Sequence, residues 1–350
     1  MHIARRITAA AAVGVMALAG SSVAAQAAPT GAAGAFTPAA ADTRVSPDGK
    51  VNKMGAPLTA ANNAAVARAV ASGVPKGDPP KPGSKGVQKR NAVINGKALA
   101  LTYFYAGGYQ YPTGSPLPDG GYSRFRIALP YRNSADFHVV TEVAVESADS
   151  QQTVEIVAVT SDNICGVGNS PCLYPYHWIH NVGQGWGVNF TPVVGSPITV
   201  GETLPVGSDL RRFEIAFFDG VWWLGYEKTL GTYTWFGYFH GNLWTGASPS
   251  VTFNKMGLGQ VFGEVAANSS TPCTDMGNGQ FGDNGATPPV TNTSAGYTNS
   301  WTLRNPATGV TPSLSVNEPT PTLYRMGFQT SSVRSFHYGG PGSGGVVGGC

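Results

Sequence analysis

From about residue 91 onward, short apolar or alternating runs recur between clusters of turn-forming residues. Turn signals such as PDGG, SDN, FDG and GDNG separate runs that include ALALTYFYA, FHVVTEVAVE, TVEIVAVT, FEIAFF, VWWLGYE and QVFGEVAA. Short runs at this spacing are typical of antiparallel strands, whose side chains alternate between two faces. The pattern predicts one all-β domain over residues 91–350, an antiparallel sandwich or barrel. We expect a jelly-roll-like β-sandwich, with no helix after residue 91.

The start of the chain has a different pattern of residues. Two arginines precede the apolar run ITAAAAVGVMALAG, and small residues then lead to the triplet Ala25-Gln26-Ala27. This layout is typical of a secretory signal peptide, which we place at residues 1–27. The apolar run is shorter than the roughly 20 residues that cross a bilayer, which disfavours the alternative of a membrane anchor. The sequence therefore predicts a secreted, extracellular protein.

Residues 28–90 are expected to form a prosegment and linker. Within it, LTAANNAAVARAVASG (58–73) favours one short helix because of its alanines. The following VPKGDPPKPGSKGVQKR combines helix-breaking Pro and Gly with basic residues. It predicts an exposed linker that ends at the dibasic pair Lys89-Arg90. The segment is then either a processed prosegment or an inert spacer.

Charge is split along the chain. Residues 1–90 contain 11 Lys and Arg against 3 Asp, a net charge of +8. Residues 91–350 contain 11 Lys and Arg against 16 Asp and Glu, a net charge of −5, and the whole chain therefore carries +3. The basic excess lies before the predicted domain, so the domain is not expected to bind nucleic acid. With 12% charged residues and 47 glycines, the composition suits an extracellular β protein with many tight turns.

Four cysteines follow the signal peptide, namely Cys165, Cys172, Cys273 and Cys350. An even number in an exported protein suggests disulfides, and four cysteines allow three pairings. The close spacing of Cys165 and Cys172 favours a local staple, which leaves Cys273 to pair with Cys350. Metal binding is the competing reading, but the chain has no C-x-x-C and no nearby pair of histidines.

Candidate chemistry comes from glutamates inside apolar strands. Four of them sit in runs of Val, Ile, Phe or Ala: Glu142, Glu155, Glu214 and Glu264. Burial of a carboxylate is costly and raises its pKa, which is a common property of catalytic acids. The alternative is that these glutamates point to solvent from the polar face of a half-buried sheet. Strand pattern alone does not select two of the four.

A family resemblance does select two. TVEIVAVT, followed by the loop between Cys165 and Cys172 and by LYPYHWI, is similar to the first signature of the neprosin family. FFDGVWWLGYEKTLGTYTWFGYFHGNLW resembles its W-W-L segment, and VFGEVAANSSTPCTDMGNGQFGDNGATPP resembles its G-G-E-V strand and the turn that follows. The resemblance covers roughly residues 95–303. It departs from the family pattern in lacking the usual tryptophan of the first strand, and in having Asn278 and Gln280 in the turn.

The resemblance implies a glutamic peptidase, of a bacterial type, that cuts after proline and uses Glu155 and Glu264. Two carboxyl groups that face one water tend to share a proton, so that one is the base and the other the acid at the same pH. Activity at acid pH with no metal or cofactor is therefore expected. Four aromatic residues are candidates for lining the cleft, although each is better suited to filling the core: Trp178, Trp235, Tyr238 and Trp244.

The expected partners are proline-containing peptides, with the prosegment as an inhibitor and the mature protein a monomer. Neither nucleic acid nor membrane is expected as a partner. Glu142 and Glu214 are expected to be bystanders. A different class of function is a carbohydrate-active β-sandwich, because glycosidases also use two carboxylates and aromatic rings stack on sugars. A non-catalytic lectin-like module is a third possibility, in which both glutamates are ordinary surface residues.

Overall fold

The computed structural model describes residues 43–55, 64–166, 170–245, 252–283, 296–329 and 332–350. The expected signal peptide (1–27) and the first residues of the expected prosegment lie outside these ranges. All described residues belong to one compact unit. None of the helices in the described ranges is long and apolar enough to cross a membrane.

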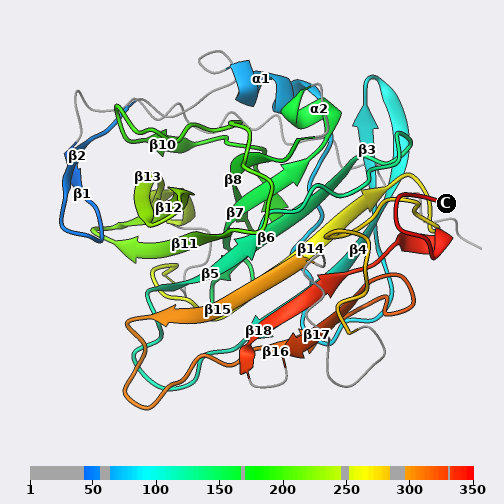
Figure 1. Cartoon of the computed structure of the whole chain (residues 1–350). Helices are drawn as coiled ribbons and strands as arrows, with labels where there is room; N and C mark the ends of the chain where they lie inside the picture. Colours follow the sequence, from blue (N-terminus) through cyan, green and yellow to red (C-terminus); the bar gives the residue numbers. More distant parts are fainter. Residues whose placement is uncertain (1–42, 56–63, 167–169, 246–251, 284–295, 330–331) are drawn as a thin grey trace, which may run out of the picture. The chain divides into compact units, whose positions relative to one another are not determined.

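Two antiparallel sheets make up the unit, and they confirm the predicted β-sandwich (Figure 1). The first, here called the β14 sheet, has the order β16 (Ser315–Asn317), β4 (Lys97–Gln110), β14 (Leu258–Ala267), β6 (His138–Glu146), β7 (Thr153–Thr160), β8 (Cys172–Ile179) and β9 (Val182–Gly183), with β3 (Gln88–Ile94) paired to β4. The second, the β11 sheet, has the order β10 (Phe190–Pro192), β13 (Thr232–His240), β12 (Val221–Thr229), β11 (Leu210–Phe218), β5 (Gly120–Arg126), β15 (Gly296–Arg304), β18 (Ser332–Gly339) and β17 (Arg325–Gln329).

Regular structure outside the two sheets is short. A hairpin of β1 (Thr43–Val45) and β2 (Val51–Lys53) forms a separate pair of strands. The helix expected within residues 58–73 is α1 (Ala64–Ala71), whereas residues 56–63 lie outside the described ranges. After residue 91 the described chain contains one α-helical turn, α2 (Asp162–Cys165), and the 3-10 turns Gly241–Trp244 and Gly342–Gly344. These turns connect strands and do not alter the β architecture.

The core lies between the sheets and fixes which face of β14 points outward. A Cβ added at Gly263 would meet Tyr338 of β18, and one added at Gly259 would meet Trp301 of β15. Odd-numbered residues of β14 therefore face the β11 sheet. Because strand side chains alternate, Glu264 points away from the inter-sheet core, onto the outer face of the β14 sheet.

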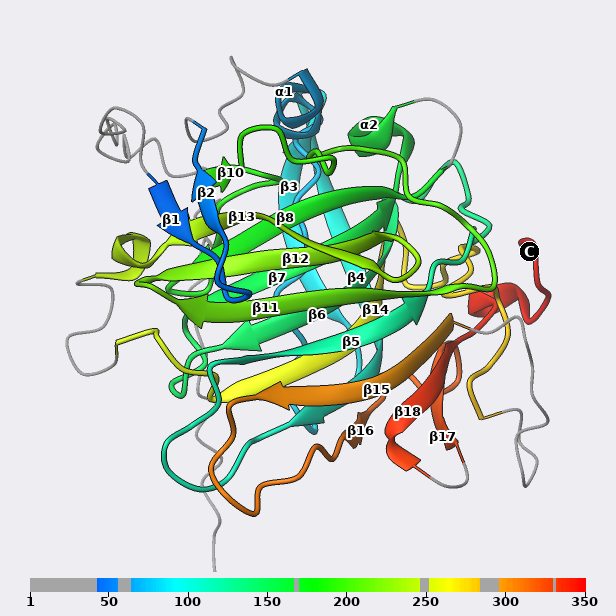
Figure 2. The same cartoon turned by 60° about the vertical axis from the view of Figure 1, so that its left-hand side comes forward.

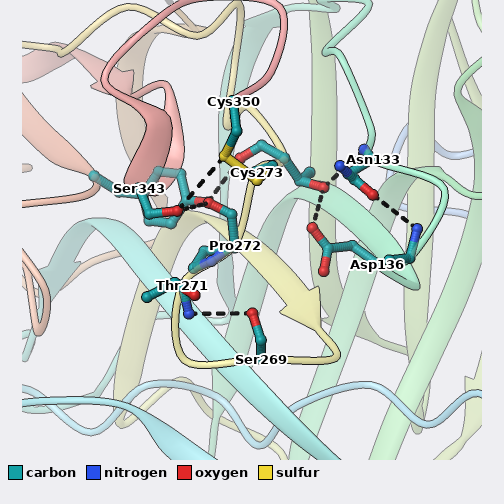
Figure 3. Close-up of a disulfide and its surroundings, with 11 residues drawn as sticks. Asn133, Asp136, Ser269, Thr271, Pro272, Cys273, Ser343 and Cys350 are labelled. Carbon is teal, nitrogen blue, oxygen red and sulfur yellow. Dashed lines mark hydrogen bonds between the residues drawn. A yellow bond between two sulfur atoms is a disulfide. The ribbon is translucent and has the colours of Figure 1, made fainter.

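Both disulfides form as predicted, Cys165–Cys172 next to α2 and Cys273–Cys350 at the C-terminus. Figure 3 shows Cys350 beside Ser343, whose hydroxyl donates a hydrogen bond to the carbonyl of Pro272. The nearby Asp136 carboxylate accepts from the hydroxyl of Thr274 at 2.6 Å. The second disulfide closes a loop of 77 residues, for which the chain-entropy model gives roughly 4 kcal/mol of stabilisation. These contacts fix the chain that follows β14, and hence the end of the strand that carries Glu264.

Candidate active site

Three glutamates from adjacent strands gather on the outer face of the β14 sheet. Glu264 of β14 pairs with Val140 of β6, and Glu155 of β7 pairs with Ala144 of β6. Glu142 lies between these two positions on β6, on the same face by alternation. All three side chains are fully buried. The solvent-facing alternative considered from the sequence therefore does not hold for them.

A single lysine joins the three carboxyl groups. The Nζ atom of Lys76 lies 2.9 Å from Glu142 Oε1, 3.3 Å from Glu155 Oε1 and 3.5 Å from Glu264 Oε2. Lys76 is itself fully buried. Three carboxyl oxygens thus surround one point at contact distance, and a small polar molecule placed at that point could touch all three.

The three carboxyl groups differ in their tendency to ionise. Burial raises the pKa of Glu155 to about 6 although Lys76 opposes the shift, and burial holds the pKa of Glu142 well above its ordinary value. Burial acts in the same direction on Glu264, but Lys76, His138 and the Gly77 N–H together lower its pKa. Within the cluster, Glu264 is therefore the group that ionises first as pH rises.

The segment that carries Lys76 crosses the site in close contact with it. We call residues 74–80 the crossing segment. The indole of Trp186 donates to the carbonyl of Val74 at 2.9 Å, and the hydroxyl of Tyr103 donates to that of Pro75 at 3.0 Å. The hydroxyl of Tyr105 donates to the carbonyl of Asp78 at 2.9 Å. These bonds hold the backbone of the crossing segment along the glutamate face.

The crossing segment was expected to be part of an exposed linker, and this expectation is wrong. The side chain of Lys76 is buried, and the Gly77 N–H donates to Glu264 Oε1 at 3.2 Å. A Cβ at residue 77 would lie 2.1 Å from the Tyr105 hydroxyl oxygen, so only glycine allows this approach. The composition of the segment predicted solvent exposure, because Pro, Gly and Lys are common in linkers. The same residue types also occur where the backbone makes a tight contact, so composition does not distinguish the two.

The aromatic candidates divide between two places. The ring of Trp178 lies 6.0 Å from Lys76 Nζ. The backbone carbonyl of Trp178 accepts a hydrogen bond from the Trp244 indole at 2.8 Å. Trp235 and Tyr238 instead pack with Met54 in a cluster on the β11 sheet. The structure does not bring Trp235 and Tyr238 to the glutamates. Trp178 is the candidate that borders the cluster, with Trp244 buried behind it.

Glu214, the fourth glutamate found from the sequence, lies on the β11 sheet. Its carboxylate forms ion pairs with Arg212 and with Arg304, the latter at 2.8 Å. It has no part in the cluster around Lys76. Sequence reasoning predicted that neither Glu214 nor Glu142 takes part in the reaction; the structure places Glu214 far from the predicted pair in the fold and Glu142 next to it.

A histidine completes the site and was not identified from the sequence. His138 Nε2 lies 2.7 Å from Glu264 Oε1, and both side chains are fully buried. The imidazole ring packs against Trp186 at 5.6 Å between ring centroids. The sequence did contain an indication of His138, because the alternation in FHVVTEVAVE places it on the same face as Glu142.

Comparisons with known proteins agree with the sequence resemblance. The family model of neprosin matches residues 194–341, a range that includes Glu264 but not Glu155. Among solved structures, Scytalido-glutamic peptidase with a peptide-based transition-state analogue matches at 9% identity and a TM-score of 0.33. That match covers 69% of this chain and 99% of the other. A search of curated proteins finds no match. From residue 194 to residue 341, the chain is therefore similar to the neprosin family.

Proposed function

We propose that the chain is a glutamic endopeptidase in which Glu155 and Glu264 act on one shared water. The observation that carries the proposal is the convergence of their carboxyl groups within 3.5 Å of a single point, the Nζ atom of Lys76. Peptide hydrolysis needs a base to activate water and an acid to protonate the leaving nitrogen. Two carboxyl groups around one water supply both roles when they hold one proton between them.

The difference in pKa suggests how the roles divide. Glu264, whose pKa is lowered, takes a proton from the water as the base. Glu155, whose pKa is about 6, holds a proton at acid pH and donates it to the leaving nitrogen. Activity is then present below the pKa of Glu155 and is lost as pH rises through it. Lys76 lowers this pKa, so departure of Lys76 moves the loss of activity to higher pH.

Proline preference is part of the proposal and rests on the family resemblance. The site is compatible with it, because the buried ring of Trp178 borders the cluster and a pyrrolidine ring packs well on an aromatic face. We further propose that the protein is made for secretion, as the layout of residues 1–27 suggests.

The prosegment is proposed to keep the enzyme latent. Lys76 occupies the point at which the shared water would be activated, and its ammonium neutralises the carboxylates that would act as base. The crossing segment also covers the glutamate face on which a peptide substrate would lie. A substrate gains access only when this segment leaves.

The function is tested by a cleavage assay on two matched peptides. One contains a single internal proline, and the other has alanine at that position. Purified full-length protein is acidified, and products are identified by mass spectrometry at acid and at neutral pH. We expect cleavage after proline at acid pH, slower cleavage of the alanine peptide and little activity at neutral pH. Absence of cleavage after complete removal of the prosegment would contradict the proposal, and equal cleavage of both peptides would refute the proline preference alone.

A further inference from the structure

We propose that His138 is a positioning residue that keeps Glu264 ionised, so that Glu264 rather than Glu155 acts as the base. The inference rests on the proposed function and adds a residue to its machinery. Neither the family match nor the predicted glutamate pair assigns a role to His138. The inference starts from the short contact between His138 Nε2 and Glu264 Oε1.

The direction of this hydrogen bond follows from its chemistry. An ionised carboxylate has only acceptor oxygens, so the Nε2–H of His138 donates to Glu264. Among the described residues, the Nδ1 atom of His138 has no hydrogen-bond partner. The polar contact of the ring is thus directed at Glu264. The strand register supports this placement, because His138 pairs with Ala266, which lies two residues from Glu264 on the same face.

His138 is the partner that Glu264 keeps when the prosegment leaves. In the intact chain, Glu264 Oε2 contacts Lys76 and Oε1 accepts from the Gly77 N–H. Both of these groups depart with the crossing segment, whereas His138 belongs to β6 and stays. Glu155 loses the same Lys76 contact. The histidine therefore maintains the difference between the two glutamates in the active form.

The remaining titratable groups around Glu264 do not replace this contact. They are Lys76, Asp78, Tyr103, Tyr105, Tyr176, Glu142 and Glu155. Lys76 and Asp78 belong to the crossing segment. The pKa values of the three tyrosines are raised above 10 by burial, so all three stay neutral in acid. Negative charge on Glu142 or Glu155 would raise the pKa of Glu264, which is opposite to the effect of His138.

Removal of the donor should therefore shift the acid limb of the pH profile. In His138→Phe the ring shape is kept but the N–H is lost, so the pKa of the buried Glu264 rises. The base is then protonated at a higher pH, and the acid limb of kcat/KM moves upward by about one pH unit, a tenfold loss of activity below the limb. In His138→Gln the side-chain amide can still donate, and a smaller shift is expected. A purely structural role would lower activity equally at every pH.

The experiment compares pH profiles of kcat/KM for the acid-activated wild type, His138→Phe, His138→Gln and His177→Gln. His177 is a matched control, because it is also fully buried in the β14 sheet but packs against Phe239 and Trp244. Its variant should keep the wild-type acid limb. An unchanged acid limb in both His138 variants would overturn the proposal.

A second readout does not depend on activity. Glutamate ¹³C-carboxyl signals of the full-length protein are titrated by NMR, and Glu264 is assigned by the loss of its signal in Glu264→Gln. The Glu264 signal should titrate at a higher pH in His138→Phe than in the parent protein. If the Glu264 signal shifts in this way but the acid-activated wild type cleaves no peptide, the proposed function fails while the role of His138 in the ionisation of Glu264 stands. If the Glu264 titration is the same in both proteins, the proposal is overturned whatever the activity.

Discussion

At the scale of single residues, the site depends on charges that are buried. Lys76 and its three carboxyl partners are fully buried, and the carboxyl groups hold the pKa of Lys76 well above its ordinary value in spite of burial. Removal of one partner from a buried ion pair typically costs 3–5 kcal/mol, because the other charge is left uncompensated. The cluster therefore makes the crossing segment sensitive to protonation.

The signs of the pKa shifts define when acid can release the segment. A lowered carboxyl pKa contributes stability that is lost as pH falls through the folded-state value, and Glu264 has such a shift. In the intact chain Lys76 also lowers the pKa of Glu142 and of Glu155 against the effect of burial, so protonation of either carboxyl removes an attraction to Lys76. Glu264 is the last of the three to be protonated as pH falls, so release should be complete only below 4.5, the ordinary glutamate value.

Gly77 offers a direct test of latency at this scale. In Gly77→Ala the added Cβ would collide with Tyr103 and Tyr105, so the crossing segment should no longer fit against Glu264. We expect a precursor that cleaves a proline-containing peptide just below pH 4.5 without the initial lag of the wild type. The lag is measured by continuous fluorescence of a quenched peptide. Val51→Ala is the control, since Val51 also precedes the crossing segment but its side chain is 73% exposed, and this variant should keep the lag. An unchanged lag in Gly77→Ala would mean that the crossing segment does not inhibit.

At the scale of elements, the pattern of apolar residues and turn signals predicted individual strands, but not the order in which they pair. The runs TVEIVAVT and QVFGEVAA became β7 and β14, and cysteine spacing predicted both disulfides. The order of the strands was not accessible in the same way. β6 lies between β7 and β14, and this long-range pairing is what brings Glu142 and His138 to the two predicted glutamates. A local alternation gives the face of a strand but not its neighbours.

The predicted aromatic residues show the same limit. Trp235 and Tyr238 lie in a segment that resembles the family, and their sequence neighbourhood gave no indication of which sheet they join. Their strand, β13, belongs to the β11 sheet, whereas Trp178 lies on β8 of the β14 sheet. Aromatic residues fill cores and clefts alike, so only the sheet assignment separated them.

Strand β3 changes the expected position of maturation. Lys89 and Arg90, the dibasic pair at which the exposed linker was expected to end, pair with Thr102 and Leu101 of β4, and Arg90 also donates to the carbonyl of Lys76 at 3.2 Å. A protease needs an extended, accessible backbone, which a paired strand does not provide. The loop from Lys81 to Gly86 precedes β3 and has exposed residues at Lys81, Gly83, Lys85 and Gly86. We therefore expect maturation in this loop.

N-terminal sequencing of the acid-matured protein checks this position. If the enzyme processes itself after proline, the bond between Pro82 and Gly83 is the expected site within the loop. In Pro82→Ala this product should form more slowly, while Lys89→Gln should leave its position and rate unchanged. A mature N-terminus at residue 91 would contradict the assignment to the loop.

At the scale of the whole described unit, the segment proposed as a prosegment contacts both sheets. Met54 forms a bridge with Val193 and joins the aromatic cluster of the β11 sheet, while the crossing segment covers the β14 sheet. Figure 2 shows β1 and β2 over the β11 sheet, with α1 and β3 beside the β14 sheet. The charge split agrees with such contact, because residues 28–90 carry 9 Lys and Arg against 3 Asp, which is +6, and residues 91–350 carry −5. A cut in the loop alone would thus leave the prosegment bound until its contacts weaken in acid.

The central claim is that Glu155 and Glu264 perform the chemistry, and the most direct test is the turnover of Glu155→Gln and Glu264→Gln. Both proteins are freed of the prosegment by the same added protease, and folding is checked by circular dichroism. Glu146→Gln is the matched control, because Glu146 is a buried carboxyl on β6 with a pKa of about 8 and is already neutral in acid. Glutamine keeps the size of glutamate but can act neither as base nor as acid, so each site variant should lose at least ~100-fold in kcat. The control should stay close to wild type, and a folded Glu264→Gln protein with near wild-type kcat would contradict the account.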